Sequence, residues 1–150
     1  MPFTSTTHVR WPDVDQNGHM RTTAYLDAAE DNRMRYFASG GFPVTEFAAR
    51  RLGPVSHGHD IRYRAEMRLL DPIVVELRLA GLASDGARFR LHNKIIRADG
   101  RTAATITTTA GWLDLDARRL VAPPAELLAL LTALERTKDF TELPSPLAHA

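Results

Sequence analysis

Residues 59–69 alternate between two sets of side chains, one mainly apolar and the other charged. The first set comprises His59, Ile61, Tyr63, Ala65, Met67 and Leu69, and the second comprises Asp60, Arg62, Arg64, Glu66 and Arg68. A repeat of two residues places successive side chains on opposite faces of a β-strand. The pattern therefore predicts a strand that turns one face toward the core.

Three further strands are predicted after this one, at residues 73–82, 87–97 and 101–113. Turn-forming sequences separate the strands, namely Asp71-Pro72, Ser84-Asp85-Gly86 and Asp99-Gly100. Four consecutive strands joined by short turns predict an antiparallel meander. A sheet with one apolar face needs another element to cover that face.

One long helix, at residues 23–38, is placed to cover the sheet. A short strand at residues 6–11 precedes it, Pro12 ends that strand, and a loop follows. Thr22 or Thr23 can cap the helix, and Ser39-Gly40-Gly41 stops it. Residues 42–58 form a connecting segment with room for a helical turn or two. The predicted fold class is α+β.

The C-terminal part of the chain predicts one more helix and a tail. Residues 125–135 are amphipathic and follow Pro123-Pro124, which favours a short helix. The remaining residues are polar and contain prolines. We therefore expect a single domain over residues 1–136 and a loosely ordered tail over residues 137–150.

Composition excludes several classes of function. The 150 residues carry a formal net charge of +1, which argues against general attraction to nucleic acid or to an anionic membrane. The absence of cysteine excludes disulfides, a thiol nucleophile and a thiolate metal site. No stretch has the apolar length of a secretory signal or a membrane span. The expected location is the cytoplasm.

The most specific motif lies between the first strand and the long helix. Residues 11–20 read Trp-Pro-Asp-Val-Asp-Gln-Asn-Gly-His-Met, and Tyr25-Leu26 follow. This string resembles the opening signature of hotdog-fold acyl-CoA thioesterases of the 4-hydroxybenzoyl-CoA thioesterase type. The resemblance continues in Ile-Arg-Tyr-Arg-Ala-Glu at 61–66, in Asp71 and in the turn at 97–100, and covers roughly residues 6–119.

The resemblance implies a hotdog fold, in which a curved antiparallel β-sheet wraps around one long central α-helix. It also implies a homodimer or homotetramer with active sites at the interface between subunits. The substrate would be an acyl-CoA or acyl-carrier thioester, and its hydrolysis needs no cofactor. An exposed sheet edge, which pairing between subunits would cover, is compatible with this expectation.

Asp15 matches the catalytic carboxylate of this family, as nucleophile or as the general base for a water molecule. His19 and Asn17 are further catalytic candidates, because either can orient water, bond the thioester oxygen or steady Asp15. The alternative for Asp13 and Asp15 is that these loop carboxylates only bond nearby amides.

The helix N-terminus offers unpaired amides near Thr22 and Thr23, which match the carbonyl-polarising amides of the family. Ordinary capping is the alternative, and both can hold together. The sequence departs from the common pattern here, since many relatives have an Asn pair where this chain has Arg21-Thr22. Tyr25, from the same motif, is a candidate for substrate binding.

Glu66 is a further substrate-site candidate, with cross-strand charge pairing as the alternative. The arginines at positions 62, 64, 68, 88 and 90 can receive the phosphates of coenzyme A or form a solvated charged face. His57 and His59 lack a third metal ligand at a convincing spacing, so no metal is expected. The sequence also lacks a G-x-S-x-G elbow, a P-loop and a dinucleotide fingerprint.

Two alternatives to hydrolysis remain at this point. A hotdog hydratase or dehydratase would bind the same thioester and add or remove water at carbon. A non-catalytic acyl-CoA-binding protein would retain the pocket without the reaction, which the altered Arg21-Thr22 segment leaves open. The sequence does not specify the acyl group, because the pocket is assembled from distant residues.

Overall fold

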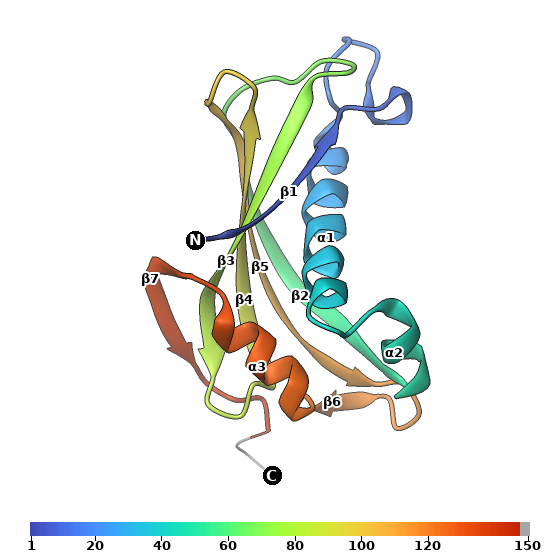
Figure 1. The fold of residues 1–150 in the computed structure, drawn as a ribbon, viewed down its shortest axis with the longest axis vertical. Helices are drawn as coiled ribbons and strands as arrows, with labels where there is room; N and C mark the ends of the chain where they lie inside the picture. Colours follow the sequence, from blue (N-terminus) through green and yellow to red (C-terminus); the bar gives the residue numbers. More distant parts are fainter. Residues whose placement is uncertain (148–150) are drawn as a thin grey trace.

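A computed structural model describes residues 1–147 and consists of one seven-stranded sheet with helices packed against it (Figure 1). The strands are β1 (Phe3–His8), β2 (Leu52–Tyr63), β3 (Pro72–Ala83), β4 (Arg88–Arg97), β5 (Thr102–Asp114), β6 (Arg119–Val121) and β7 (Arg136–Leu143). The helices are the 3-10 helix η1 (Trp11–Asp13) and the α-helices α1 (Thr22–Ser39), α2 (Val44–Ala49) and α3 (Ala125–Ala133). No helix in this part of the chain combines the length and the apolar character needed to cross a bilayer.

The strand order is β1-β3-β4-β5-β2, with β6 beside β5 and β7 beside β3. The predicted hairpins β3-β4 and β4-β5 are confirmed, and all these neighbours run antiparallel except β7, which is parallel to β3. Gly86 and Gly100 have φ values of +76° and +84° at the two turns. Glycine adopts such values without a steric penalty.

The predicted four-strand meander is wrong in one respect, because β2 lies beside β5 and not beside β3. β1 and β4 occupy the two edges of β3 along its first half, so β2 pairs with the free edge of β5. Residues 64–71 connect the two sides of the sheet, and the amides of Arg64 and Ala65 both donate to the carbonyl of Ala103. The alternation at 59–69 therefore overstates the strand, which ends at Tyr63.

Burial along β2 also differs from the expectation. The second half of β2 is largely exposed, and Tyr63 keeps 48% of its surface. The reason is that β2 is an edge strand, which has a neighbour on one side only. Met67 is fully buried, but it belongs to the irregular segment after β2.

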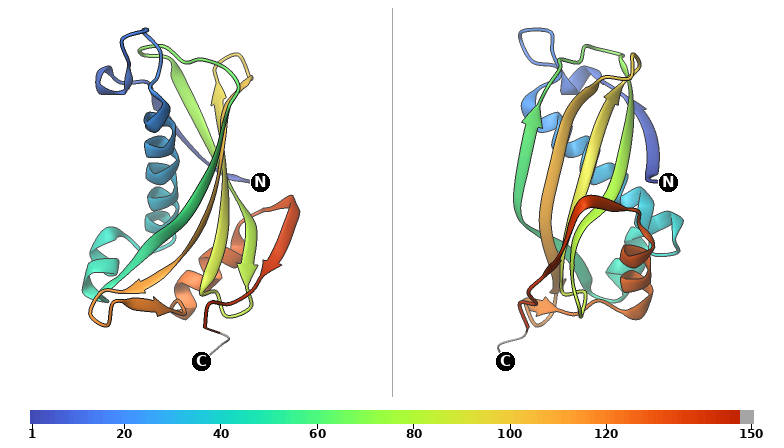
Figure 2. Two further views of the ribbon diagram at one scale, coloured as in Figure 1. Left: turned by 180° about the vertical axis from the view of Figure 1, so that it is seen from behind. Right: turned by 90° about the vertical axis from the view of Figure 1, so that its left-hand side faces the viewer.

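α1 is the longest helix, and it lies across one face of the sheet (Figure 2). It contacts β1, β3, β4 and β5. Its N-cap is Arg21, without a hydrogen bond from a capping side chain, so the predicted capping by Thr22 or Thr23 is wrong. The helix ends at Ser39, and Gly41 takes a φ of +91° just beyond it, as the glycine pair predicts.

An aromatic cluster joins the C-terminal half of α1 to α2 and the sheet. Phe37 lies 5.8 Å from Trp112 and 6.0 Å from Phe47 between ring centroids, and Phe89 lies 4.8 Å from Trp112. All four side chains are buried. Aromatic pairs at these separations contribute beyond the area that they bury, so this end of α1 is firmly attached.

The C-terminal residues differ from the expected loose tail. Residues 136–143 form β7, and the side chain of Leu143 is buried against Gly81, where an added Cβ would lie 3.0 Å from the Leu143 Cγ. The guanidinium of Arg136 lies 4.1 Å from the centroid of the Phe140 ring. β1 pairs with β3 only as far as Leu77, so β7 pairs with the remainder of the same edge, from Leu79 to Ala83. Residues 148–150 of the expected tail lie outside the described residues.

Replacing Phe37 with alanine is expected to destabilise the protein by about 3–5 kcal/mol, because it removes a buried ring from the aromatic cluster and leaves a cavity. Urea unfolding followed by circular dichroism would measure the loss. Val44 keeps 65% of its surface, so Val44→Ala is the matched control and should change stability by less than about 0.5 kcal/mol. Equal effects of the two substitutions would contradict the assignment of Phe37 to the core.

Candidate functional site

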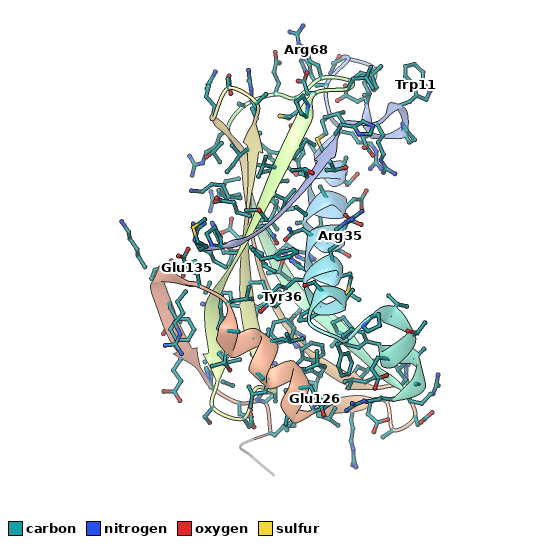
Figure 3. The ribbon with its side chains drawn as sticks, in the orientation of Figure 1. Trp11, Arg35, Tyr36, Arg68, Glu126 and Glu135 are labelled. Atoms are coloured by element: carbon teal, nitrogen blue, oxygen red, sulfur yellow. The ribbon has the colours of Figure 1, made fainter. Side chains whose placement is uncertain are left out.

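The motif at residues 11–20 forms a compact loop at one end of the molecule, next to the N-terminus of α1. Figure 3 shows Trp11 of this loop and Arg68 of the β2–β3 connection at the same end. Trp11 keeps 78% of its surface. The backbone of His19 bridges to Arg68, and the amide of Met20 donates to the carbonyl of Met67 at 2.7 Å. These bonds fix the loop against the end of the sheet.

Asp13 anchors the start of the loop. Its buried carboxylate accepts hydrogen bonds from the backbone N, the Nε and the Nη2 of Arg10, at 3.0, 3.1 and 3.0 Å. Burial by itself raises the pKa of Asp13, but the hydrogen bonds from Arg10 outweigh burial and hold this pKa below its ordinary value. The carbonyl of Asp13 accepts from the amide of Arg21 at 2.7 Å, which ties the loop to the start of α1. Asp13 is therefore a structural residue.

Asp15 occupies the turn at the tip of the loop and is partly buried. Its Oδ1 accepts from the amides of Asn17 and His19 at 2.8 and 3.2 Å, and its own amide donates to the carbonyl of His19 at 2.9 Å. Gly18 takes a φ of +76°, which allows the chain to reverse. Within residues 1–147, Oδ2 of Asp15 accepts no hydrogen bond. One oxygen thus holds the loop, and the other is available to a ligand.

His19 and Glu66 are brought together. Nε2 of His19 lies 2.9 Å from Oε2 of Glu66, whose Oε1 accepts from Arg68 at 3.1 Å. The hydrogen bond from Arg68 and the charge of His19 hold the pKa of Glu66 below its ordinary value. Glu66 therefore pairs with Arg68 of its own segment and with His19 of the loop, and not across two strands as the alternative predicts. Asn17 contributes its backbone amide, and its side chain is exposed.

The first turn of α1 is open to solvent. Thr22 and Thr23 are exposed, and the amide of Ala24 donates to the carbonyl of Arg21 at 3.0 Å. The amides of Thr22 and Thr23 find no backbone acceptor among the described residues. The guanidinium of Arg21 lies over this turn, where it donates to the carbonyl of Pro12 and to the hydroxyl of Thr23. Its Nη2 also pairs with Asp27 at 3.3 Å, so the open amides are the groups of this turn that favour an anion.

Two tyrosines support this turn from the sheet side. The hydroxyl of Tyr63 donates to the carbonyl of Thr22 at 2.8 Å. The ring of Tyr25 meets the ring of Tyr63 edge-on at 5.3 Å between centroids. Tyr25 keeps only 4% of its surface, and burial raises its pKa. Tyr25 thus packs in the core below the loop, and Tyr63, which the motif does not single out, is the more exposed of the two.

The least expected polar feature is a buried hydrogen-bond network around Arg33, in the middle of α1. Nε of Arg33 donates to Oδ1 of Asn93 at 2.8 Å, and Nη2 donates to the hydroxyl of Thr108 at 2.7 Å. Arg33 keeps 6% of its surface. A signal was present in the sequence, because Arg33 stands midway between Ala29 and Phe37 at a spacing of four residues, on the face of the helix that should be apolar.

A small cavity of about 110 Å³ lies between this part of α1 and the sheet. Its lining residues are Glu30, Arg33, Met34, Phe37, Pro54, Ser56, Phe89, Leu91, Thr108 and Ala110. The walls are mainly apolar, and Arg33 and Thr108 supply buried polar groups. The cavity is thus suited to a largely apolar group with a polar end.

The other predicted residues have partners of their own. Arg62 pairs with Asp60 at 2.8 Å, and Nε of Arg90 donates to Thr109 at 3.2 Å. Nδ1 of His59 lies 2.8 Å from the hydroxyl of Thr108. Within residues 1–147, no group of three or more His, Asp or Glu side chains is arranged to hold a metal ion.

Comparison with known proteins identifies relatives by sequence and by structure. A family model for the thioesterase-like superfamily matches residues 9–131. An L-carnitine dehydrogenase/betainyl-CoA thioesterase from Agrobacterium fabrum is 34% identical over 139 residues. The match covers 93% of this chain but 28% of that protein, so the chain spans little more than a quarter of the relative's length.

Two solved structures are similar in fold. One is a hypothetical protein from Staphylococcus aureus in complex with CoA, with a TM-score of 0.81, 23% identity, and coverage of 100% of this chain and 94% of that one. The other is a 1,4-dihydroxy-2-naphthoyl-CoA thioesterase from Synechocystis, with a TM-score of 0.79, 17% identity, and coverage of 89% and 98%. At these identities the likeness establishes the fold alone.

Asp13→Asn is expected to destabilise the protein at pH 7 by about 1–3 kcal/mol, because it breaks charge-assisted hydrogen bonds to a buried carboxylate. The folded pKa of Asp13 is lowered, so its contribution is present above the unfolded pKa of about 3.9 and is lost as the pH falls through the folded value. The difference from the wild type should therefore shrink below about pH 4, as measured by urea unfolding at several pH values.

Asp60→Asn is the control for Asp13→Asn. It removes an exposed ion pair with Arg62, so it should change stability by less than about 1 kcal/mol at any pH. An effect of Asp13→Asn that stayed constant down to pH 2 would contradict the ionised state assigned to Asp13.

Proposed function

The chain belongs to the thioesterase-like superfamily, and from this premise we propose that it hydrolyses an acyl-CoA thioester to a carboxylic acid and a free thiol. Relatives and structural neighbours named as CoA thioesterases support the reaction. A neighbour bound to CoA supports the class of substrate. In this proposal the fold is a hotdog fold, and α1 is its central helix.

One observation carries the proposal. The Asp15 carboxylate is held by two amides through Oδ1, its Oδ2 accepts no hydrogen bond from the described residues, and its loop leads directly into the exposed first turn of α1. Acyl transfer requires a base or nucleophile on one side of the carbonyl carbon and hydrogen-bond donors for the oxygen. Asp15 and the amides of Thr22 and Thr23 supply both within one short segment.

The proposed reaction begins with the thioester carbonyl oxygen at the amides of Thr22 and Thr23. Asp15 either removes a proton from water as the water oxygen attacks, or attacks the carbonyl carbon itself and forms an anhydride that water then opens. In both routes the carbon–sulfur bond breaks, and the thiolate leaves and takes up a proton. In this proposal His19, which pairs with Glu66 at 2.9 Å, steadies Asp15 or the water.

The proposed substrate path follows α1. The acyl group occupies the cavity lined by Met34, Phe37 and Leu91, and the pantetheine arm enters between subunits. In this proposal the phosphates of coenzyme A bind to arginines among those at positions 62, 64, 68, 88 and 90, since guanidinium matches phosphate geometry. We further propose that the protein acts in the cytoplasm.

The proposed assembly is a homodimer or homotetramer. Among the described residues, β2 has β5 as its only partner strand, and its second half is exposed. An unpaired edge readily pairs with another chain. Sedimentation equilibrium at micromolar concentration should therefore give an integral multiple, two or four, of the 16.7 kDa chain mass. A monomer under these conditions would contradict the proposed assembly.

Asp15→Asn is expected to lower kcat by roughly 10²–10⁴-fold, because the amide side chain is neither a base nor a nucleophile. Thiol release would be followed over short, branched, long and aromatic acyl-CoAs and over betainyl-CoA. The amide retains Oδ1 as an acceptor for the bonds from Asn17 and His19, so the loop should keep its structure.

Asp116→Asn is the matched control, because Asp116 is an exposed carboxylate that pairs with Arg51. It should leave kcat within about twofold of wild type. Full activity in Asp15→Asn would exclude the proposed role of Asp15. Thioester binding without turnover of any substrate would favour an acyl-CoA-binding protein, and addition of water at carbon would favour a hydratase.

A further inference from the structure

Arg33 is a buried cation that forms no ion pair within residues 1–147. It lies on the face of α1 that packs on the sheet and keeps 6% of its surface. Its hydrogen-bond acceptors are a neutral amide, Asn93, and a neutral hydroxyl, Thr108. No carboxylate of the described chain forms an ion pair with it. Burying a charge without a counter-ion is costly, so the position calls for an explanation beyond packing.

Arg33 remains charged at neutral pH. Burial lowers its pKa to about 10, and Glu30, one turn earlier on α1, acts weakly in the opposite direction. This pKa is still well above 7. The protein therefore maintains a poorly solvated positive charge inside the fold, and such a charge interacts strongly with any anion that reaches it.

The guanidinium is held in a fixed orientation. Nδ2 of Asn93 donates to Oδ1 of Asn32 at 2.9 Å and to the carbonyl of Glu76 at 3.1 Å. Asn32 in turn donates to the hydroxyl of Ser5 at 2.8 Å. Asn93 on β4 is thus oriented by bonds to α1 and β3, and the hydroxyl of Thr108 on β5 lies 2.8 Å from Nδ1 of His59 on β2. A site whose groups are held by such supporting bonds loses little entropy when a ligand binds.

One nitrogen of Arg33 remains for a ligand. Nε and Nη2 donate within the network, whereas Nη1 has no acceptor among the described residues. Nη1 is not fully enclosed by protein atoms, so it retains some accessible surface. Arg33 lines the cavity of about 110 Å³ beside α1, so a ligand in this cavity lies beside a residue whose Nη1 is still unbonded within residues 1–147.

We propose that this cavity receives an acyl group that ends in a carboxylate, and that Arg33 binds this carboxylate and makes the protein selective for ω-carboxyacyl thioesters. The inference rests on the proposed thioesterase function and specifies its substrate class. Guanidinium and carboxylate match in geometry and charge. The apolar walls formed by Met34, Phe37 and Leu91 accommodate the methylene chain.

The position of Arg33 along α1 limits the length of the chain. Eleven residues separate Thr22 from Arg33, which is roughly 16 Å of helix axis. Side chains on a helix lean toward its N-terminus, so the guanidinium lies closer to the first turn than its Cα does. A diacid of medium length therefore spans the distance from the thioester carbonyl to Arg33 better than a two- or three-carbon diacid.

Glu30 lines the same cavity and is exposed. Its carboxylate repels an incoming anion but is well solvated, whereas the charge of Arg33 is not. Attraction by Arg33 should therefore dominate. Removing the charge of Glu30 should strengthen binding of a carboxylate, and this expectation distinguishes an anion site from a purely structural arginine.

The test compares adipyl-CoA with its monomethyl ester, which has the same chain without the charge. The wild type should show at least a tenfold higher kcat/KM for adipyl-CoA. Arg33→Lys should retain part of this preference, Arg33→Met should reduce the ratio to about one, and Glu30→Gln should raise it. Succinyl-CoA and suberyl-CoA, with their methyl esters, test the dependence on length.

Binding of free adipate provides a second readout without a thioester. Calorimetry should detect adipate binding to the wild type and Glu30→Gln, and at least tenfold weaker binding to Arg33→Met. If Arg33→Met fails to fold, as judged by circular dichroism, the other two variants still test the inference. Adipate binding should weaken in Arg33→Lys and strengthen in Glu30→Gln.

A wild-type preference for the methyl ester, or no preference, would overturn the inference while the thioesterase proposal stands. Failure to hydrolyse any thioester, together with adipate binding that depends on Arg33, would overturn the thioesterase proposal and support the carboxylate site.

Discussion

The attachment of α1 to the sheet is the interaction on which every functional feature depends. The aromatic cluster around Phe37 fixes its C-terminal half, and the network of Arg33 fixes its middle. At its N-terminus, the Arg21 amide donates to Asp13 and the carbonyl of Thr22 accepts from Tyr63. Because these contacts lie along the whole helix, they hold the open amides of its first turn at a fixed distance from the cavity beside its middle.

The three attachments differ in their physical character. Aromatic packing near Phe37 is stabilising by itself, since burial of apolar area drives folding. The network around Arg33 contributes less net stability, because its hydrogen bonds have to offset the desolvation of a cation. If stability were the only requirement, an apolar residue would be expected at position 33, on the buried face of α1. The cation at this position therefore fits a requirement for binding better than a requirement for folding.

The sequence predicts most elements, because their signals are local. Alternation and glycine turns define the β3-β4-β5 hairpins, and Gly41 marks the end of α1. The partner of β2 is not a local property, since it depends on which edges β1 and β4 leave free. The strand β7 has a weak pattern of its own and forms because Leu143 packs against Gly81. Asp15 and His19 come from one motif, and Glu66 from a separate stretch of the resemblance. Arg33 is 60 residues from Asn93 and 75 residues from Thr108, so only the fold joins these three.

The structural and catalytic interpretations of Asp15 are compatible because a carboxylate has two oxygens. Oδ1 closes the loop through the amides of Asn17 and His19, and this leaves Oδ2 fixed in direction without a partner in the described chain. A side chain that did not hold its own loop would sample several rotamers and lose entropy in reaching a reactive geometry. Arg21 adds to this arrangement. Its guanidinium lies over the first turn of α1, where it also pairs with Asp27 at 3.3 Å, and in the proposed reaction a positive charge beside open amides favours negative charge on a carbonyl oxygen.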